Sequence, residues 1–190
     1  MKNNERKIQL LKAASKRFSK LGYNKTTLEE VARDIRIGKA TIYHYFKSKD
    51  ELFYEVIEWE SNELLEKIKS IFNNESVEIF ERFFRYFQYK ENILSENKMI
   101  VNLLLKKISS DLIDKESDLV NKLIENEVEI LRLVISFINR EQIEKFDENI
   151  PREIVTLSWM LAFINNKFSH QNRKLFNDER LRSFIKIFIN

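Results

Sequence analysis

Residues 26–52 contain the side chains whose types and spacing suggest a chemical role. The segment reads TTLEEVARDIRIGKATIYHYFKSKDEL and groups basic, hydroxyl and aromatic side chains around a short helix expected at residues 39–46. Lysine can contact a phosphate or the edge of a guanine, and threonine can contact a base or a thymine methyl group. This grouping favours contact with the major groove and the backbone of double-stranded DNA.

The helical pattern explains how these side chains are presented. Thr27 and Glu30 have the spacing of a capping box, which predicts that a short helix begins at Thr27. In the next helix Ile42 and Phe46 are four residues apart and form an apolar anchor behind a polar face. Two short helices around a tight turn make a helix-turn-helix, whose second helix enters the major groove. The predicted DNA contacts are Thr27, Arg36, Lys39, Ala40, Thr41, Tyr43, His44, Tyr45, Lys47 and Lys49.

A packing role is the alternative for some of these aromatic residues. Tyr45 lies nearer the core side of its helix, so packing and DNA contact are both open for it. His44 could be an ordinary exposed residue. A second capping box, Ser48 with Glu51, is expected to start the long fourth helix.

The composition favours an all-α fold. Two glycines and one proline in 190 residues are too few for the turns of a β-sandwich or a doubly wound sheet. Apolar residues recur at helical spacing. Helices are predicted at residues 5–21, 27–35, 39–46, 48–72, 76–90, 95–108, 115–143, 151–169 and from 177 onward. We expect about nine helices, with a three-helix helix-turn-helix DNA-binding domain at residues 1–48 joined by the long fourth helix to a helical body at residues 49–190.

Several classes of function are disfavoured by what the sequence lacks. It has no cysteine and two histidines, so we expect no metal site and no cofactor. It has no paired carboxylates in an evident motif, no glycine-rich phosphate loop and no nucleophile with a histidine partner, so we expect no enzyme. No apolar run reaches the roughly 18 residues that span a bilayer, and the N-terminus lacks the apolar run of a signal peptide. We expect a cytoplasmic protein without a membrane partner.

The charge is unevenly distributed along the chain. Residues 1–57 hold 13 Lys and Arg against 7 Asp and Glu, a net charge of +6, whereas residues 58–190 carry a net charge of −3. A basic first segment suits a protein that meets a polyanion. The alternative is that these lysines only form the solvated face of ordinary helices and have no polyanion partner.

At these positions the sequence resembles the TetR family of bacterial transcriptional regulators. The family signature of the second helix appears here as Thr26, Thr27, Val31 and Ala32. The signature of the third helix and the start of the fourth appears as Thr41, Ile42, Tyr43, Tyr45, Phe46, Ser48, Lys49, Asp50 and Leu52. The resemblance covers about residues 6–55. It departs from the family pattern at Arg36 and Gly38, where the family usually has Gly in the turn and then Ser or Thr.

The resemblance implies that residues 49–190 form a ligand-binding and dimerisation domain. It implies a repressor that binds a pseudo-palindromic operator as a homodimer and is released by a small-molecule effector. The helix expected at residues 151–169 is apolar on two faces, which supports a partner copy on one of them. The predicted dimer-interface residues are Val155, Trp159, Phe163, Leu181, Phe184 and Phe188.

The ligand is expected to be apolar. Candidate lining residues of its pocket are Trp59, Phe83, Phe87, Met99, Leu103, Leu131 and Trp159, each of which could instead be ordinary core packing. The alternative to a regulator is a helical ligand-binding or interaction protein that has the same fold and has lost specific DNA binding.

Overall fold

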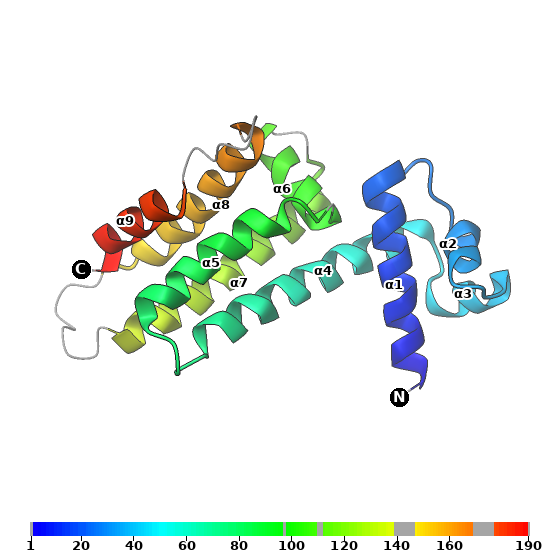
Figure 1. Cartoon of the computed structure of the whole chain (residues 1–190). Coiled ribbons are helices and arrows are strands. Elements are labelled where there is room, and N and C mark those ends of the chain that lie inside the picture. The colour runs from blue at the N-terminus through cyan, green and yellow to red at the C-terminus, as the bar shows by residue number, and fades with distance from the viewer. Residues whose placement is uncertain (1, 97, 110–111, 139–146, 169–176, 190) are drawn as a thin grey trace. The chain divides into compact units, whose positions relative to one another are not determined.

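A computed structural model describes residues 2–96, 98–109, 112–138, 147–168 and 177–189. Within these residues all regular structure is helical, and Figure 1 labels the helices α1 to α9. The helices are α1 (Lys2–Leu21), α2 (Leu28–Asp34), α3 (Lys39–Tyr45), α4 (Lys49–Phe72), α5 (Ile79–Ile93), α6 (Met99–Ser109), α7 (Asp114–Ile138), α8 (Ile150–Phe168) and α9 (Asp178–Ile189). The prediction of an all-α fold is confirmed.

Most helix ends lie within three residues of the predicted ends, and α6 differs most. It begins at Met99 rather than near Ser95, because the backbone N–H groups of Ser95 and Glu96 bond to the last turn of α5 at distances of 3.1 Å. Pro151 lies in the first turn of α8, where its missing N–H costs nothing. The predicted helical residues 139–143 and 169 lie outside the described residues.

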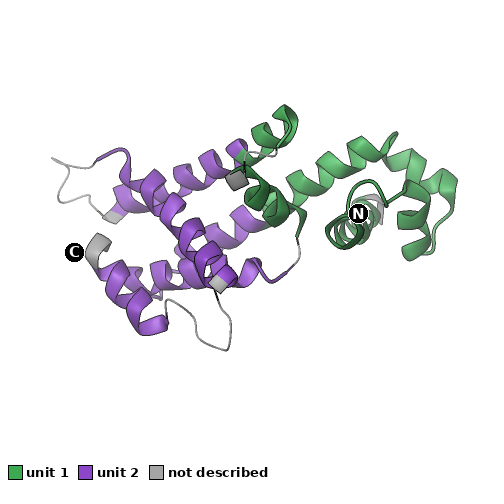
Figure 2. Cartoon of the chain, turned by 90° about the horizontal axis from the view of Figure 1, so that it is seen from above, with its two compact units in different colours: residues 1–63, 97–120 green, residues 64–96, 121–190 purple. Residues whose placement is uncertain are grey.

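The chain divides into two compact units (Figure 2). Unit 1 contains residues 1–63 and 97–120, and unit 2 contains residues 64–96 and 121–190. Helices α4 and α7 each contribute residues to both units. In unit 1, α1 packs against α2 and α6; in unit 2, α5 packs against α8 and α9. The functional boundary that we expect at residue 48 stays a prediction.

The core of unit 1 is built from apolar residues at helical spacing. Phe53 of α4 is central, with its ring edge-on to Phe18 at 5.2 Å and to Tyr23 at 5.1 Å between ring centroids. The other buried side chains of α1 to α4 in this core include Leu10, Leu11, Ala14, Leu28, Val31, Ala32, Ile42, Phe46, Leu52, Val56 and Ile57. Burying each large side chain of this kind stabilises the fold by about 1.5–3 kcal/mol.

A buried carboxylate connects three helices within unit 1. Glu60 of α4 is 1% exposed and accepts a hydrogen bond from Ser15 Oγ of α1 at 2.5 Å. It also accepts one from the backbone N–H of Ile100 at 2.8 Å. That N–H belongs to the first turn of α6, where a helix has no internal acceptor to offer. Burial raises the pKa of Glu60, although these hydrogen bonds oppose the rise. Glu60 therefore caps α6 and ties it to α1.

The core of unit 2 is largely aromatic. Phe83, Phe84 and Phe87 of α5 are buried, and Phe72 at the end of α4 meets Phe83 edge-on at 5.0 Å. Phe80, which shares their stripe in the sequence, is half-buried. No helix in the described part of the chain is both long enough and apolar enough to span a membrane.

Replacing Glu60 with alanine is expected to lower the free energy of unfolding by about 2–3 kcal/mol, because the buried N–H of Ile100 and the hydroxyl of Ser15 lose their acceptor. Ser15→Ala removes one of these hydrogen bonds and should cost about 1 kcal/mol. Urea denaturation followed by circular dichroism measures both. Glu63→Ala, at an exposed site on the same helix, is the matched control and should change stability by less than about 0.5 kcal/mol. Equal urea midpoints for Glu60→Ala and Glu63→Ala would contradict the capping role.

Candidate nucleic-acid interface

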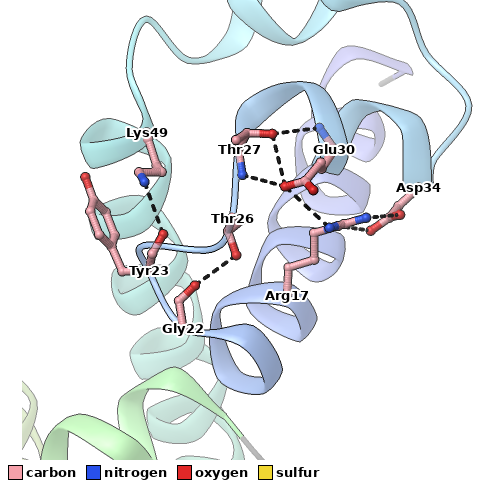
Figure 3. Close-up of polar contacts among 8 residues, drawn as sticks. All are labelled: Arg17, Gly22, Tyr23, Thr26, Thr27, Glu30, Asp34 and Lys49. Carbon is pink, nitrogen blue, oxygen red and sulfur yellow. Dashed lines mark hydrogen bonds and ion pairs between the residues drawn. The ribbon is translucent and has the colours of Figure 1, made fainter.

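The start of α2 is fixed by the capping box that the sequence predicts. Thr27 Oγ1 accepts a hydrogen bond from the backbone N–H of Glu30 at 3.3 Å, and the Glu30 carboxylate accepts one from the backbone N–H of Thr27 at 2.9 Å (Figure 3). Next to it, the buried Thr26 donates its hydroxyl hydrogen to the carbonyl of Gly22 at 3.0 Å. The loop before α2 and the first turn of α2 are therefore bonded to each other and to the end of α1.

Arg17 of α1 holds α2 at both of its ends (Figure 3). Its guanidinium donates two hydrogen bonds to Asp34 at 2.5 and 2.8 Å, a bidentate geometry, and lies 3.6 Å from the Glu30 carboxylate. Hydrogen bonding to Arg17 lowers the pKa of Asp34. Such an exposed pair contributes little energy by itself, but its two-ended geometry sets the direction of α2 on α1.

The turn between α2 and α3 keeps its form despite the unusual residues in it. Arg36 adopts the left-handed conformation, with φ of 57°, which costs a non-glycine residue about 1–2 kcal/mol. The N–H of Ile37 bonds back to the carbonyl of Ala32 at 2.9 Å. Gly38 is the N-cap of α3 and offers no side-chain bond, as expected for glycine. The helix-turn-helix therefore forms with Arg36 and Gly38 in place.

Helix α3 has the two faces that its sequence predicts. Ile42 and Phe46 are both 0% exposed and anchor the helix in the core of unit 1. The exposed residues of the opposite face and the helix start are Lys39, Ala40, Thr41, Tyr43 and His44. Arg36, in the turn before α3, is exposed as well. A short helix with a rigid back and an exposed polar front has the form that groove contact requires.

Glu29 of α2 contacts two residues of this exposed face, which the sequence did not predict. Its carboxylate lies 2.8 Å from Lys39 Nζ and accepts a hydrogen bond from Tyr43 Oη at 3.0 Å. Lys39 Nζ also lies 5.7 Å from the centroid of the Tyr43 ring. The hydrogen bond from Lys39, together with backbone and Tyr43 hydrogen bonds, lowers the pKa of Glu29 to about 2. Two predicted DNA contacts are thus bound to a carboxylate in the DNA-free protein.

Lys49 also has a partner within the protein. Its ammonium donates to the backbone carbonyl of Tyr23 at 3.1 Å and lies 4.1 Å from the centroid of the Tyr23 ring (Figure 3). The side chain is half-buried. Lys49 therefore holds the first turn of α4 to the loop that precedes α2. Tyr45 is half-buried too, with its ring centroid 6.4 Å from that of Phe46.

The capping box predicted at the start of α4 forms in one direction only. Ser48 Oγ accepts the backbone N–H of Glu51 at 3.1 Å. The Glu51 carboxylate accepts the backbone N–H of Lys47, at 2.6 Å, where the predicted motif would use that of Ser48. The side chain of Lys47 stays exposed. Across the described part of the chain, no group of three or more His, Cys, Asp or Glu could hold a metal ion.

Residues 10–56, which include this whole arrangement, match the family model described as "Bacterial regulatory proteins, tetR family". The HTH-type transcriptional regulator YhgD of Bacillus subtilis, itself uncharacterised, is 48% identical over 52 residues, which are 27% of each chain. The helix-turn-helix segment of the chain is that of the TetR family. The family resemblance that the sequence suggested is thereby confirmed.

Similarity to other proteins extends from this TetR-family segment to the rest of the chain. The icaADBC biofilm operon negative regulator IcaR of Staphylococcus epidermidis is 34% identical over 41 residues, 22% of each chain. A solved structure from Clostridium perfringens, a candidate fatty acid metabolism regulator, is 28% identical and covers 95% of this chain and 96% of its own, with a TM-score of 0.60. The chain spans about a quarter of the length of each of these two curated relatives, YhgD and IcaR.

The seven predicted pocket residues are divided between the two units. Trp59, Met99 and Leu103 belong to unit 1, and Phe83, Phe87, Leu131 and Trp159 belong to unit 2. All are buried except Trp59, which is half-buried. A hollow of about 330 Å³ on unit 2 has none of the seven in its lining, which consists of Lys67, Ser70, Ile71, Asn74, Arg85, Gln88, Tyr89 and Asn92. The pocket assignment stays a prediction.

The predicted dimer-interface residues differ in exposure. Val155, Trp159 and Leu181 are 1%, 5% and 3% exposed, so the single chain already covers them. Phe163 and Phe184 are half-exposed. The side chain of Phe188 lies outside what the structure describes. The residues of this set that a second copy could still cover are therefore the two half-exposed phenylalanines.

Replacing Arg36 with glycine is expected to raise the free energy of unfolding by about 0.5–1 kcal/mol, because glycine adopts a φ of 57° without steric cost and loses part of that gain to its freer unfolded chain. Urea denaturation measures the change. Gly22→Ala is the matched opposite: Gly22 has φ of 83° and no atom within 4 Å of an added Cβ, so backbone strain alone should destabilise the variant by about 1 kcal/mol. A destabilised Arg36→Gly variant would show that the Arg36 side chain makes a compensating contact.

Proposed function

We propose that this protein is a transcriptional repressor without enzymatic activity. It binds a pseudo-palindromic operator in the cytoplasm as a homodimer and is released by a small, apolar ligand. The observation that carries the proposal is the two-sided α3: Ile42 and Phe46 are fully buried, while Lys39 and Tyr43 are 69% and 41% exposed. This helix lies inside the segment that matches the family model.

The exposed residues divide by the kind of contact that they can make. Lys39 and Thr41, with the small Ala40 and His44 beside them, suit the edges of bases in the groove. Tyr43 and Lys47 suit phosphates, which fix the position of the protein without reading sequence. Arg36 and Thr27 are exposed on the flanking turns and suit phosphates as well. For Lys49 and Tyr45 a supporting role fits best, since Lys49 is bonded to Tyr23 and Tyr45 packs beside Phe46.

Glu29 makes DNA binding by this face a competition. Lys39 forms an ion pair with the Glu29 carboxylate, and Tyr43 donates a hydrogen bond to it. A phosphate or a guanine edge must replace Glu29 as the partner of these two side chains. Such a carboxylate weakens binding to any DNA and leaves affinity to depend on the contacts that a correct sequence supplies. It is also the observation that favours the second candidate function, a helical interaction protein of the same fold that has lost specific DNA binding.

A homodimer would present two copies of α3 to successive major grooves, which requires two-fold symmetry in the protein and in the operator. The last two helices are the proposed contact. Half-exposed Phe163 and Phe184, together with Met160, which is 51% exposed, offer apolar surface on α8 and α9.

An apolar effector suits the aromatic interior of unit 2 and agrees with the description of the Clostridium perfringens protein as a candidate fatty acid metabolism regulator. Repression is supported by the description of IcaR as a negative regulator. Ligand binding would change the course of α4, which contributes to both units, and with it the spacing of the two recognition helices in the dimer. The protein would then no longer fit its operator.

Selection of bound sequences from a pool of random DNA tests the proposal. We expect enrichment of a site with two inverted half-sites, because a symmetric dimer reads the same sequence twice. We also expect affinity to fall steeply with salt concentration, by a slope that reflects the phosphates contacted. Lys39→Ala and Thr41→Ala should change the enriched sequence, and Tyr43→Ala should weaken binding to all sequences alike.

Two results would contradict this proposal. A pool that shows no enriched sequence and no salt-sensitive binding would favour the interaction protein. A sedimentation experiment that finds only the 23.0 kDa monomer at micromolar concentration would exclude the homodimer.

Replacing Glu29 with glutamine is expected to increase affinity for the selected DNA roughly three- to tenfold at low salt. The change removes a negative charge from the DNA face and frees Lys39 for the groove and Tyr43 for a phosphate. One additional lysine that neutralises DNA charge should also steepen the dependence of log affinity on log salt by about 0.9. Fluorescence anisotropy titrations at several salt concentrations measure both quantities.

Glu63→Gln removes the same charge from an exposed site on α4 and is the matched control. It should change the affinity by less than twofold, since only long-range charge is involved. If Glu29→Gln and Glu63→Gln have the same effect, Lys39 and Tyr43 do not contact DNA.

A further inference from the structure

Unit 2 contains a cluster of polar side chains at its centre that DNA binding does not use. Lys90 comes from α5 and Glu127 from α7, and both are 0% exposed. Tyr86, one turn before Lys90, is also 0% exposed, while Ser158 and Trp159 of α8 are 1% and 5% exposed. Three helices therefore direct ionisable or hydrogen-bonding groups to one buried point in a largely apolar interior.

Glu127 is well supplied with partners in this cluster. Its carboxylate accepts hydrogen bonds from Tyr86 Oη at 2.5 Å and from Trp159 Nε1 at 3.0 Å, and it forms an ion pair with Lys90 Nζ. Tyr86 Oη also lies 2.9 Å from Ser158 Oγ. The negative charge is thus surrounded by donors on both of its oxygens.

Lys90, in contrast, has fewer hydrogen-bonding partners than its N–H groups could use. An ammonium has three N–H donors and no acceptor. Among the residues that the structure describes, Lys90 Nζ forms an ion pair with the Glu127 carboxylate, and no other acceptor bonds to it. Its other close neighbours are aromatic faces: the Trp159 ring centroid lies 3.5 Å away and the Tyr86 ring centroid 5.2 Å away. Burial lowers the pKa of Lys90 to about 8, so the amine is still largely protonated at neutral pH.

Stability does not explain such an arrangement. A buried ion pair is often no more stabilising than apolar side chains of the same volume, and unpaired N–H groups in an interior add a further cost. Buried polar groups in native proteins nearly always have partners, so one that lacks them calls for a specific reason. An oxygen acceptor that enters from outside the chain would supply that reason.

The charge of the cluster selects the kind of acceptor. Lys90 and Glu127 together are neutral, so an anionic ligand would leave a net negative charge in the core and a cationic ligand a net positive one. A neutral carbonyl oxygen can accept the free N–H groups without creating a buried net charge. The aromatic surfaces select the rest of the molecule, since Phe163 stacks on Trp159 at 5.9 Å between centroids and is itself half-exposed. The stack leads from the buried amine toward the surface of unit 2.

We propose that Lys90, Trp159 and Glu127 form the polar anchor of a ligand site for a neutral aromatic or apolar compound that carries a carbonyl oxygen. The oxygen accepts from Lys90 Nζ, the Trp159 ring covers the apolar part of the compound, and Glu127 fixes the amine. This inference rests on the proposed function, because it names the chemical class of the effector that the body would bind.

Three naphthalenes of the same size test the site with the full chain. 2-Acetylnaphthalene carries a neutral carbonyl, 2-ethylnaphthalene has no acceptor, and 2-naphthoate is anionic. Equilibrium dialysis measures the affinity of each. We expect the acetyl compound to bind about tenfold more tightly than either of the others, which is the effect of one net hydrogen bond of about 1.4 kcal/mol.

A double variant, Lys90→Met with Glu127→Gln, tests the anchor itself. Methionine removes the donors, and glutamine avoids an unpaired buried charge while keeping one acceptor oxygen for Tyr86 or Trp159. In this variant the preference for the acetyl compound should fall below about twofold. Lys67→Met, at an exposed lysine of α4 in the same unit, is the control and should keep the tenfold preference.

Equal affinity of the unmodified chain for all three compounds, or no binding of any of them, would overturn the site and would show that Lys90 has a structural role or bonds only to water. A double variant that keeps the preference would overturn the assignment to Lys90. The comparison on the unmodified chain decides the proposal even if the double variant does not fold. A chain that prefers the ketone but enriches no DNA sequence would contradict the proposed function and leave this site standing.

Discussion

Helices of seven residues are not stable by themselves in water, and the exposed face of this protein is built on two of them. Both α2 and α3 exist because residues outside them supply what their length cannot. Arg17 bonds to the first and last turns of α2, and Ile42 and Phe46 sink α3 into the core that α1 and α4 complete. The positions of Thr41 and Tyr43 on the surface are therefore set by a guanidinium on α1 and by two apolar side chains facing away from the solvent.

The features that could be predicted from sequence are those that depend on local spacing. The capping box of Thr27 and Glu30 and the anchor of Ile42 and Phe46 are patterns within one or two helical turns, and the structure confirms both. Arg36, which stands where the family pattern usually has Gly, adopts the left-handed conformation. Helix periodicity likewise gave the order of the helices and most of their ends.

The features that sequence reasoning missed join residues that are distant in the chain. Glu29 meets Lys39 and Tyr43 only once the turn has folded α3 back toward α2, and because that turn interrupts the helix, helical periodicity does not predict contacts at separations of 10 and 14 residues. The late start of α6 depends on turns at the end of α5. The pairing of Lys90 with Glu127 requires knowing which faces of α5 and α7 oppose each other. The charge distribution indicated a basic surface on residues 1–57. It could not reveal which lysines of that surface already have a partner within the protein.

The two units also treat buried charge in opposite ways. Glu60 in unit 1 is surrounded by donors from the backbone and from a hydroxyl, so its burial strengthens a junction between helices. Lys90 in unit 2 has Glu127 as its ionic partner and aromatic rings beside it, but no other acceptor among the described residues bonds to its N–H groups. The first arrangement holds a structure in one form, whereas the second leaves hydrogen-bonding capacity unused.

Unit 1 is not a continuous stretch of chain, since it combines residues 1–63 with residues 97–120. This matters for anyone who would build chimeric regulators by exchanging N-terminal segments between relatives. A junction at residue 48 would combine α1 of another protein with Glu60 and α6 of this one. The buried Glu60 carboxylate would then lose its hydrogen bond from Ser15 unless the new α1 also has a donor at that position. Exchange of residues 1–48 alone therefore replaces only one side of the contact that joins α1 to Glu60 and α6. A transplant that respects the architecture must carry α6 and the first turns of α7 with it.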